Sequence, residues 1–156
     1  MRFMRLPVVL VGLLMMTTRV FAGCEQLSVN TSRGVVHDTA SGLTWSRCLL
    51  GQVGSGCLGD GIGLSWVDAI NQARAFELGG VSNWRLPKVD ELVKLFAIGP
   101  VCLAAAFPGS GAAVAWSASA NLDYATDAWA FDLAKSAAVI RARDSKLQVL
   151  LVASPK

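Results

Sequence analysis

The chain has 156 residues, of which 53% are hydrophobic and 16% are charged. Its formal net charge of +3 comes from 14 basic and 11 acidic residues. Residues 1–22 contain three of the basic residues and no acidic one, so residues 23–156 are neutral. A neutral domain is not held to nucleic acid or to an anionic membrane by broad electrostatic attraction, and we expect neither partner.

The first 22 residues are typical of a signal peptide. Arg2 and Arg5 precede the apolar residues 6–16, and Ala22 ends an A-x-A-like cleavage site. The apolar run is shorter than the roughly 20 residues that span a bilayer. We therefore expect an exported protein, located in the periplasm, on the outer membrane surface or outside the cell. We expect no transmembrane span in the mature chain.

The same junction has a second interpretation. Residues 21–24, Phe-Ala-Gly-Cys, resemble a lipobox, in which Cys24 becomes the acylated N-terminus. Phe21 is a poor substitute for the usual leucine, and the polar residues 17–19 separate the hydrophobic run from Cys24. These two details favour cleavage after Ala22 without lipidation.

Residues 23–156 have the length of one ordinary domain and contain no internal repeat or linker. Four cysteines in an exported chain indicate disulfides, for which three connectivities exist. Cys48 and Cys57 flank a glycine-rich loop and are the natural local pair. Cys24 and Cys102 would then tie the N-terminus to the middle of the domain, whereas lipidation of Cys24 would leave Cys102 unpaired. The chain has no C-x-x-C pair, which disfavours a zinc site.

In chain order, residues 23–45 read as short strands and turns, and residues 51–63 as a glycine-rich loop. A helix is predicted from Ser65, where Ser65 and Asp68 fit a capping box, to about Phe76, with glycines 79 and 80 ending it. A second helix with an apolar stripe is predicted after Pro87.

The remainder of the chain changes to a period of two. Residues 99–115 are rich in alanine, glycine and proline and are predicted to form a long covering loop. Strands are predicted to begin at Trp116 and over residues 128–133, 138–143 and 147–152, the last two joined at residues 144–146. Strands, two helices and then an antiparallel meander indicate the α+β class.

Several short segments recur together in one known family. They are residues 34–45 (G-V-V-H-D-T-A-S-G-L-T-W), the cysteine at 48, residues 84–87 (W-R-L-P), residues 107–108 (F-P) and residues 116–119 (W-S-A-S). In this order and spacing they resemble the bacterial Lcl C-terminal domain family, and W-R-L-P before an amphipathic helix is the most specific of them.

The resemblance implies a C-type-lectin-like fold, with two helices against antiparallel strands and long loops tied by disulfides. It also implies an adhesin-like binding module for a surface carbohydrate or an envelope protein. One departure bears on a ligand site. The closing V-R-x-V-R of the family is here Val-Leu-Leu-Val-Ala at residues 149–153, so Leu150 and Ala153 stand where the family has arginines.

The candidate ligand-binding residues lie between positions 116 and 127. Trp116, Ser117 and Ser119 place hydroxyl groups beside an aromatic ring, which suits a sugar but equally suits a sheet face packed under a loop. The same loop contains oxygen-bearing residues that are candidate calcium ligands, namely Asn121, Asp123 and Asp127. Their spacing is not that of an EF-hand, and a solvated loop is the favoured interpretation. No other cofactor is expected.

Two further residues have a structural and a functional interpretation. Trp84 and Arg85 would be able to face a ligand, but we expect Trp84 in the core and Arg85 hydrogen bonded to loop carbonyls, with Pro87 setting the helix start.

Catalysis is not predicted. His37 is the only histidine, and Asp38 beside it points to the opposite face of a strand. We therefore predict a non-catalytic binding module, with a structural and possibly lipid-anchored envelope component as the alternative.

Overall fold

The computed structural model describes residues 23–155, so the predicted signal peptide and its cleavage site at residues 1–22 lie outside the described residues. Eight strands and three helices occur in this range. In chain order they are β1 (Leu27–Asn30), β2 (Val35–Asp38), β3 (Thr44–Ser46), α1 (Trp66–Ala75), β4 (Trp84–Arg85), α2 (Val89–Phe96), α3 (Pro100–Ala106), β5 (Val114–Ala120), β6 (Asp127–Asp132), β7 (Ala137–Ala142) and β8 (Val152–Ala153). The predicted α+β class is confirmed.

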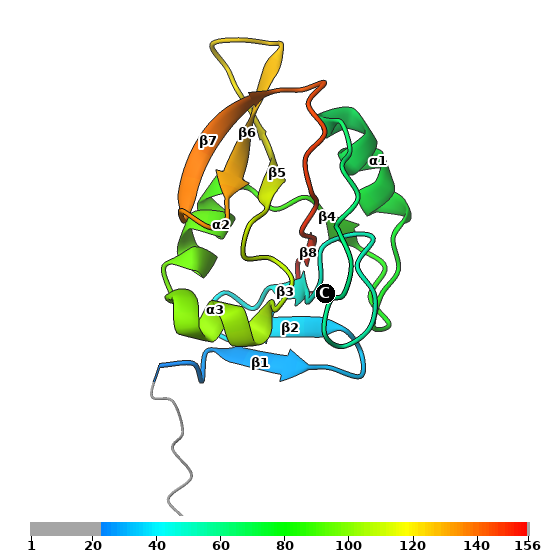
Figure 1. Ribbon diagram of the computed structural model, residues 1–156, viewed down its shortest axis with the longest axis vertical. Helices are drawn as coiled ribbons and strands as arrows, with labels where there is room; N and C mark the ends of the chain where they lie inside the picture. The colour runs from blue at the N-terminus through cyan, green and yellow to red at the C-terminus, as the bar shows by residue number, and fades with distance from the viewer. Residues whose placement is uncertain (1–22, 156) are drawn as a thin grey trace, which may run out of the picture.

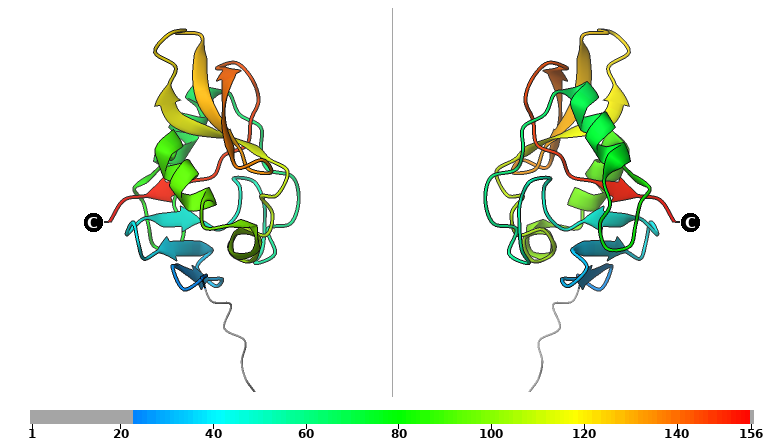
Figure 2. Two further views of the ribbon diagram at one scale, coloured as in Figure 1. Left: turned by 90° about the vertical axis from the view of Figure 1, so that its left-hand side faces the viewer. Right: turned by 90° about the vertical axis from the view of Figure 1, so that its right-hand side faces the viewer.

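The strands form two antiparallel sheets (Figure 1). The first sheet has the order β1-β2-β3-β8-β4, so the last strand of the chain lies between β3 and β4. The second sheet is the meander β5-β6-β7, in which Trp129 pairs with Ile140. Figure 2 shows this second sheet standing above the first, with the β5–β6 hairpin extending away from the body of the domain.

Helix α1 begins where the sequence predicts it. The Ser65 hydroxyl oxygen accepts a hydrogen bond from the Asp68 amide at 3.3 Å and donates one to the Asp68 carboxylate at 2.6 Å. The hydroxyl therefore caps the helix as expected, while the carboxylate binds the hydroxyl and not the Ser65 amide. Trp66, at the first position of the helix, donates its indole N–H to the Ser117 carbonyl at 2.8 Å and so ties α1 to β5.

Helix α2 depends on an ion pair at its start. The Glu91 carboxylate accepts the Lys88 amide at 2.7 Å and two bonds from Arg85 at 2.8 and 2.7 Å. Arg85 also donates to the Leu86 carbonyl at 3.1 Å. Trp84 is buried, as predicted, and Arg85 bonds a carbonyl as predicted but also pairs with Glu91. The W-R-L-P segment is therefore a joint that fixes α2 against β4.

The predicted covering loop at residues 99–115 is wrong in its first half, which forms α3. Gly99 has φ of +106°, a conformation open to glycine, and Pro100 follows at the first turn of the helix, where its missing N–H costs no hydrogen bond. The alanines that suggested a loop are strong helix formers, and Leu103 and Ala106 bury their side chains in the core. The domain therefore has three helices and not two.

Both predicted disulfides are confirmed. Cys24 bonds Cys102, which lies in α3, and Cys48 bonds Cys57 across the glycine-rich loop. The sulfur of Cys24 is used in this bond, so the same atom cannot also form the thioether of a lipoprotein.

The predicted strand at residues 147–152, joined to residues 138–143, is also wrong. After Lys146 the chain leaves the second sheet. Leu147 pairs with Leu64, and Gln148 bonds β5 on both sides, donating to the Val114 carbonyl at 3.1 Å and accepting the Trp116 amide at 3.0 Å. Only Val152 and Ala153 form a strand, and they do so in the first sheet. The apolar run thus connects the two sheets, as Figure 1 shows for the red segment.

The interior has two parts that this run separates. The first core combines β1, β2 and β3 with α2, α3 and β6, and its most buried large side chains are those of Val36, Trp45, Leu92, Phe107, Phe131 and Leu150. The second core combines α1, β4 and β5 and includes Ala69, Trp84, Leu86, Trp116, Val149 and Leu151. Among residues 23–155, no helix is long and apolar enough to cross a membrane.

The two disulfides differ in the length of chain they close, 78 residues against 9. Replacing Cys24 and Cys102 together by serine is expected to lower the free energy of unfolding by about 4 kcal/mol, because the longer loop restricts the unfolded chain more. Replacing Cys48 and Cys57 together is expected to cost about 3 kcal/mol. Urea unfolding of both variants measures this order, and the reverse order would contradict it.

The Arg85–Glu91 pair predicts a pH dependence. Burial alone would raise the pKa of Glu91, but the bonds from Arg85 and the Lys88 amide outweigh it and hold the pKa below 4.5. The ionised carboxylate therefore stabilises the fold above pH 4.5, and this contribution is lost as the pH falls through the lower pKa of the folded state. Glu91→Gln is expected to cost about 1–2 kcal/mol at neutral pH and to flatten the acid side of a stability profile.

The matched control is Asp90→Asn, whose partner Lys94 lies 3.8 Å away in an exposed pair. It is expected to change stability by less than about 0.5 kcal/mol. Equal losses in the two variants, measured by thermal unfolding between acid and neutral pH, would show that Glu91 has no special role.

Candidate functional site

The β5–β6 hairpin contains all six predicted ligand-binding residues, but it brings only some of them to the surface. Trp116 and Ser117 are fully buried. The Trp116 indole N–H donates to the Leu64 carbonyl at 2.7 Å, and the Ser117 hydroxyl donates to the Trp129 carbonyl at 2.7 Å. Both side chains therefore hold β5 in the fold and present no surface to a ligand, which agrees with the packing interpretation of these residues.

Ser119 connects the hairpin to α2. Its hydroxyl oxygen accepts the Val89 amide, at the first position of α2, at 3.1 Å. The neighbouring Ala118 amide donates to the Pro87 carbonyl at 2.7 Å. These two bonds satisfy a carbonyl and an amide at the start of α2, so Ser119 acts as a helix cap supplied by another strand.

The tip of the hairpin is ordered by one buried amide side chain. Asn121 is 6% exposed, and its side-chain oxygen accepts the Asp123 amide at 3.1 Å. In the main chain, the Asn121 N–H donates to the Asp127 carbonyl at 3.3 Å, and the Asp127 N–H donates to the Tyr124 carbonyl at 3.0 Å. Asn121 is thus committed to the turn, while Asp123 is exposed. Calcium binding by this loop stays a prediction.

The far side of the tip is held by β7 and α1. The Arg143 amide and side chain donate to the Thr126 and Asp127 carbonyls, each at 2.9 Å. The Arg143 guanidinium also stacks over the Trp66 ring at 4.3 Å from its centroid, a cation–π contact. The tip is therefore fixed to the body from both of its ends.

Two residues at this tip were not predicted. Leu122 is 95% exposed and Tyr124 is 66% exposed, on either side of Asp123. Large apolar side chains inside a polar turn are the signal that would have identified them, because a turn that only connects strands gains nothing by exposing them to water.

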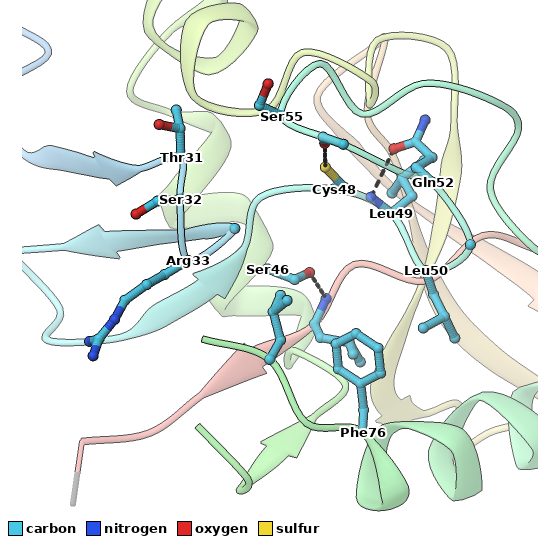
Figure 3. Close-up of a pocket in the computed structure, with 15 residues that line it drawn as sticks. Thr31, Ser32, Arg33, Ser46, Cys48, Leu49, Leu50, Gln52, Ser55 and Phe76 are labelled. Atoms are coloured by element: carbon cyan, nitrogen blue, oxygen red, sulfur yellow. Dashed lines mark hydrogen bonds between the residues drawn. The ribbon is translucent and has the colours of Figure 1, made fainter. Parts of the chain in front are cut away.

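A cavity of about 390 Å³ lies at the other end of the domain, beside the first sheet. Its walls come from the β1–β2 turn, the start of the disulfide-closed loop, the chain after α1 and the run before β8 (Figure 3). The lining residues are Thr31, Ser32, Arg33, Gly34, Ser46, Cys48, Leu49, Leu50, Gly51, Gln52, Gly54, Ser55, Phe76, Leu78 and Leu151. A volume of this size is within the range of small-molecule sites.

His37 and Asp38 lie on opposite faces of β2, as the sequence predicts. His37 is exposed on β2, with its Nδ1 3.4 Å from the Thr44 hydroxyl, whereas Asp38 is buried on the opposite face. Burial alone would raise the pKa of Asp38, but hydrogen bonds from Ser41, Gln26 and the Ala40 amide outweigh it and lower the pKa below 3.8. Within residues 23–155, no three His, Cys, Asp or Glu side chains gather where they would hold a metal ion.

The arrangement of these segments matches one known family. The model of the Lcl C-terminal domain covers residues 34–153, which include every strand except β1, all three helices and most of the cavity. This protein belongs to the Lcl C-terminal domain family. No curated protein matches the chain.

This Lcl C-terminal domain lacks the two arginines expected in its closing segment, at positions 150 and 153. Leu150 and Ala153, which stand at their positions, are 0% and 1% exposed. Here these positions belong to the interior and carry no charge. The hairpin tip and the cavity are two of its surface features, and the turn residues 31–33 of the cavity precede the matched range.

The role of Asn121 is testable by Asn121→Ala. Removing a buried amide that caps the turn is expected to cost about 1–2 kcal/mol and to speed hydrogen exchange at residues 121–127 alone. The control is Thr126→Ala, which removes an exposed hydroxyl that bonds the Asp127 carboxylate at 3.1 Å and is expected to cost less than about 0.5 kcal/mol. Faster exchange throughout the second sheet would contradict a local role.

Proposed function

We propose that this Lcl C-terminal domain is an exported, non-catalytic binding module of the bacterial envelope or surface, and that its hairpin tip contacts an envelope protein. The observation that carries the proposal is the exposure of Leu122 and Tyr124 at a hairpin that extends from the domain (Figure 2). Two disulfides support export, since such bonds persist in oxidising compartments. The relation to C-type lectins belongs to the proposal and rests on the family.

The chemistry of the tip favours a protein partner. An exposed leucine and tyrosine are anchors that release free energy when a partner's apolar surface covers them. The intervening Asp123 and the nearby Asp127 are negatively charged, and the Arg143 side chain beside them is engaged by the Asp127 carbonyl and the Trp66 ring. The tip therefore fits a protein surface with an apolar hollow and a basic rim.

A carbohydrate is the second candidate, because Tyr124 places an exposed aromatic ring beside Asp123. Sugars stack on aromatic rings and bond carboxylates, so these two residues fit one sugar unit. A structural component whose aromatic residues are all internal agrees less well, since Tyr124 is 66% exposed.

Site-specific photo-crosslinking at Leu122 in the producing cells tests the protein partner. The matched control is a crosslinker at Val101, which is 64% exposed on α3, at the opposite end of the domain from the tip. We expect a discrete crosslinked product from position 122 and none from 101. Leu122→Ser with Tyr124→Ser is expected to weaken binding to the captured protein at least tenfold, because anchors at the centre of an interface dominate its energy.

A glycan array, in calcium and again in chelator, distinguishes the carbohydrate candidate. Selective sugar binding that is lost on Tyr124→Ser, without a crosslink at 122, would move the function from protein to carbohydrate. Loss of that binding in chelator would support the calcium prediction for Asp123 and Asp127. Equal crosslinking from 122 and 101 would overturn the tip as the contact.

A further inference from the structure

The cavity beside β3 is built as a site and not as a packing gap. Gln52 holds its rim, since its side chain accepts the Leu49 amide at 2.9 Å and donates to the Gly59 and Gly109 carbonyls at 3.1 and 3.0 Å. The Cys48–Cys57 disulfide closes the same loop. These bonds hold the walls of the cavity in place, as is typical of preformed binding pockets.

The floor of the cavity is apolar. Leu49 and Leu151 are 4% and 1% exposed there, and Phe76 and Leu78 are partly buried above them. Figure 3 shows that the Phe76 ring and Ser46 border the same part of the cavity and that Leu50 lies on the other side of the ring. An apolar group of the size of a leucine or phenylalanine side chain fits such a floor and gains from leaving water.

One polar group in this floor, the Ser46 hydroxyl, makes a single hydrogen bond among the described residues. The Ser46 hydroxyl oxygen accepts the Leu151 amide at 3.0 Å, and Ser46 is 2% exposed. No acceptor for the hydroxyl proton occurs among the hydrogen bonds of residues 23–155. A buried donor without an acceptor is costly, so a ligand that brings a carbonyl oxygen to Ser46 is favoured.

The one charged side chain that lines the cavity among the described residues is that of Arg33, which is positive. Arg33 lines the mouth, and its side chain extends outward from it (Figure 3). Among the described residues, no aspartate or glutamate lines the cavity, and the nearby Glu77 lines a separate hollow with residues 78–82. A guanidinium without a competing carboxylate pairs well with the carboxylate of a ligand.

We infer that this cavity binds an N-acylated amino acid with an apolar side chain, either free or as the C-terminal residue of a peptide. The apolar side chain lies on Phe76 and Leu78, a carbonyl oxygen accepts the Ser46 hydroxyl, and the carboxylate lies at the mouth near Arg33. The apolar floor and the bonded side chain of Gln52 favour such a ligand over a sugar. The inference is independent of the hairpin tip.

A ligand series measured by isothermal titration calorimetry on the oxidised domain tests each contact. N-acetylphenylalanine is expected to bind with one-to-one saturation. Its amide lacks the carboxylate, N-acetylglycine lacks the apolar body, and 3-phenylpropanoate lacks the amide carbonyl, so each is expected to bind at least tenfold more weakly. A hexapeptide that ends in phenylalanine separates the two sources of the ligand. An affinity equal to that of N-acetylphenylalanine indicates a peptide C-terminus, and a much lower affinity indicates a free small molecule.

Substitutions at exposed positions locate the site without disturbing the core. Ser55→Trp at the mouth is expected to abolish binding of N-acetylphenylalanine, and Arg33→Glu is expected to remove the preference for the acid over the amide. The matched controls are Ser28→Trp on β1 and Arg74→Glu on α1, both exposed and outside the cavity, and neither is expected to change the affinity.

Three results would each overturn the inference. They are no binding of N-acetylphenylalanine at millimolar concentration, equal affinities for the acid and its amide, and unchanged binding in Ser55→Trp. None of them bears on crosslinking at Leu122, so the two proposals fail separately.

Discussion

The fold depends on the burial of one short apolar run, residues 149–153, between two cores. Every side chain in it is at most 1% exposed. Leu150 and Val152 belong to the first core, and Val149, Leu151 and Ala153 to the second, as the alternation of an extended chain requires. Burying each of the larger side chains contributes about 1.5–3 kcal/mol, and the run forms the only strand that pairs with both β3 and β4 in the described sheets. The run therefore contributes side chains to both cores and a strand to the first sheet.

Both exposed features are positioned by this run or by the residues just before it. The Leu151 carbonyl accepts the Ser46 amide, and the Leu151 amide donates to the Ser46 hydroxyl, so the run places the floor of the cavity. Gln148 bonds Val114 and the Trp116 amide at the base of the hairpin. The cavity and the tip therefore lie on rigid supports at opposite ends, and loops supply only the surfaces that a ligand meets.

The parts of the fold that the sequence predicts are those specified by neighbours in the chain. The capping box at Ser65, the proline before α2 and the alternation at residues 128–133 are local, and the elements that they indicate are present. The local cysteine pair is predictable for the same reason. Helix α3 is not predicted from the sequence, because its alanines carry no apolar stripe. The closing run is predicted as a hairpin strand, although an unbroken apolar sequence indicates burial on both faces and not one. The cavity is assembled from segments as distant as Thr31 and Leu151, and no local pattern encodes such a juxtaposition.

Charge decides how binding at the tip has to work. Residues 23–156 have equal numbers of acidic and basic side chains, so no long-range field draws a partner to the domain. In the proposed complex, affinity at the tip then depends on the release of water from Leu122 and Tyr124, and discrimination depends on Asp123 between them. Anchors of this kind act on dissociation more than on association. They work only if they are held in place beforehand, because ordering a loose turn on binding would offset the gain. The buried Asn121 and the Arg143 bonds provide that order, which explains why a turn with two exposed anchors is tied so firmly at its base.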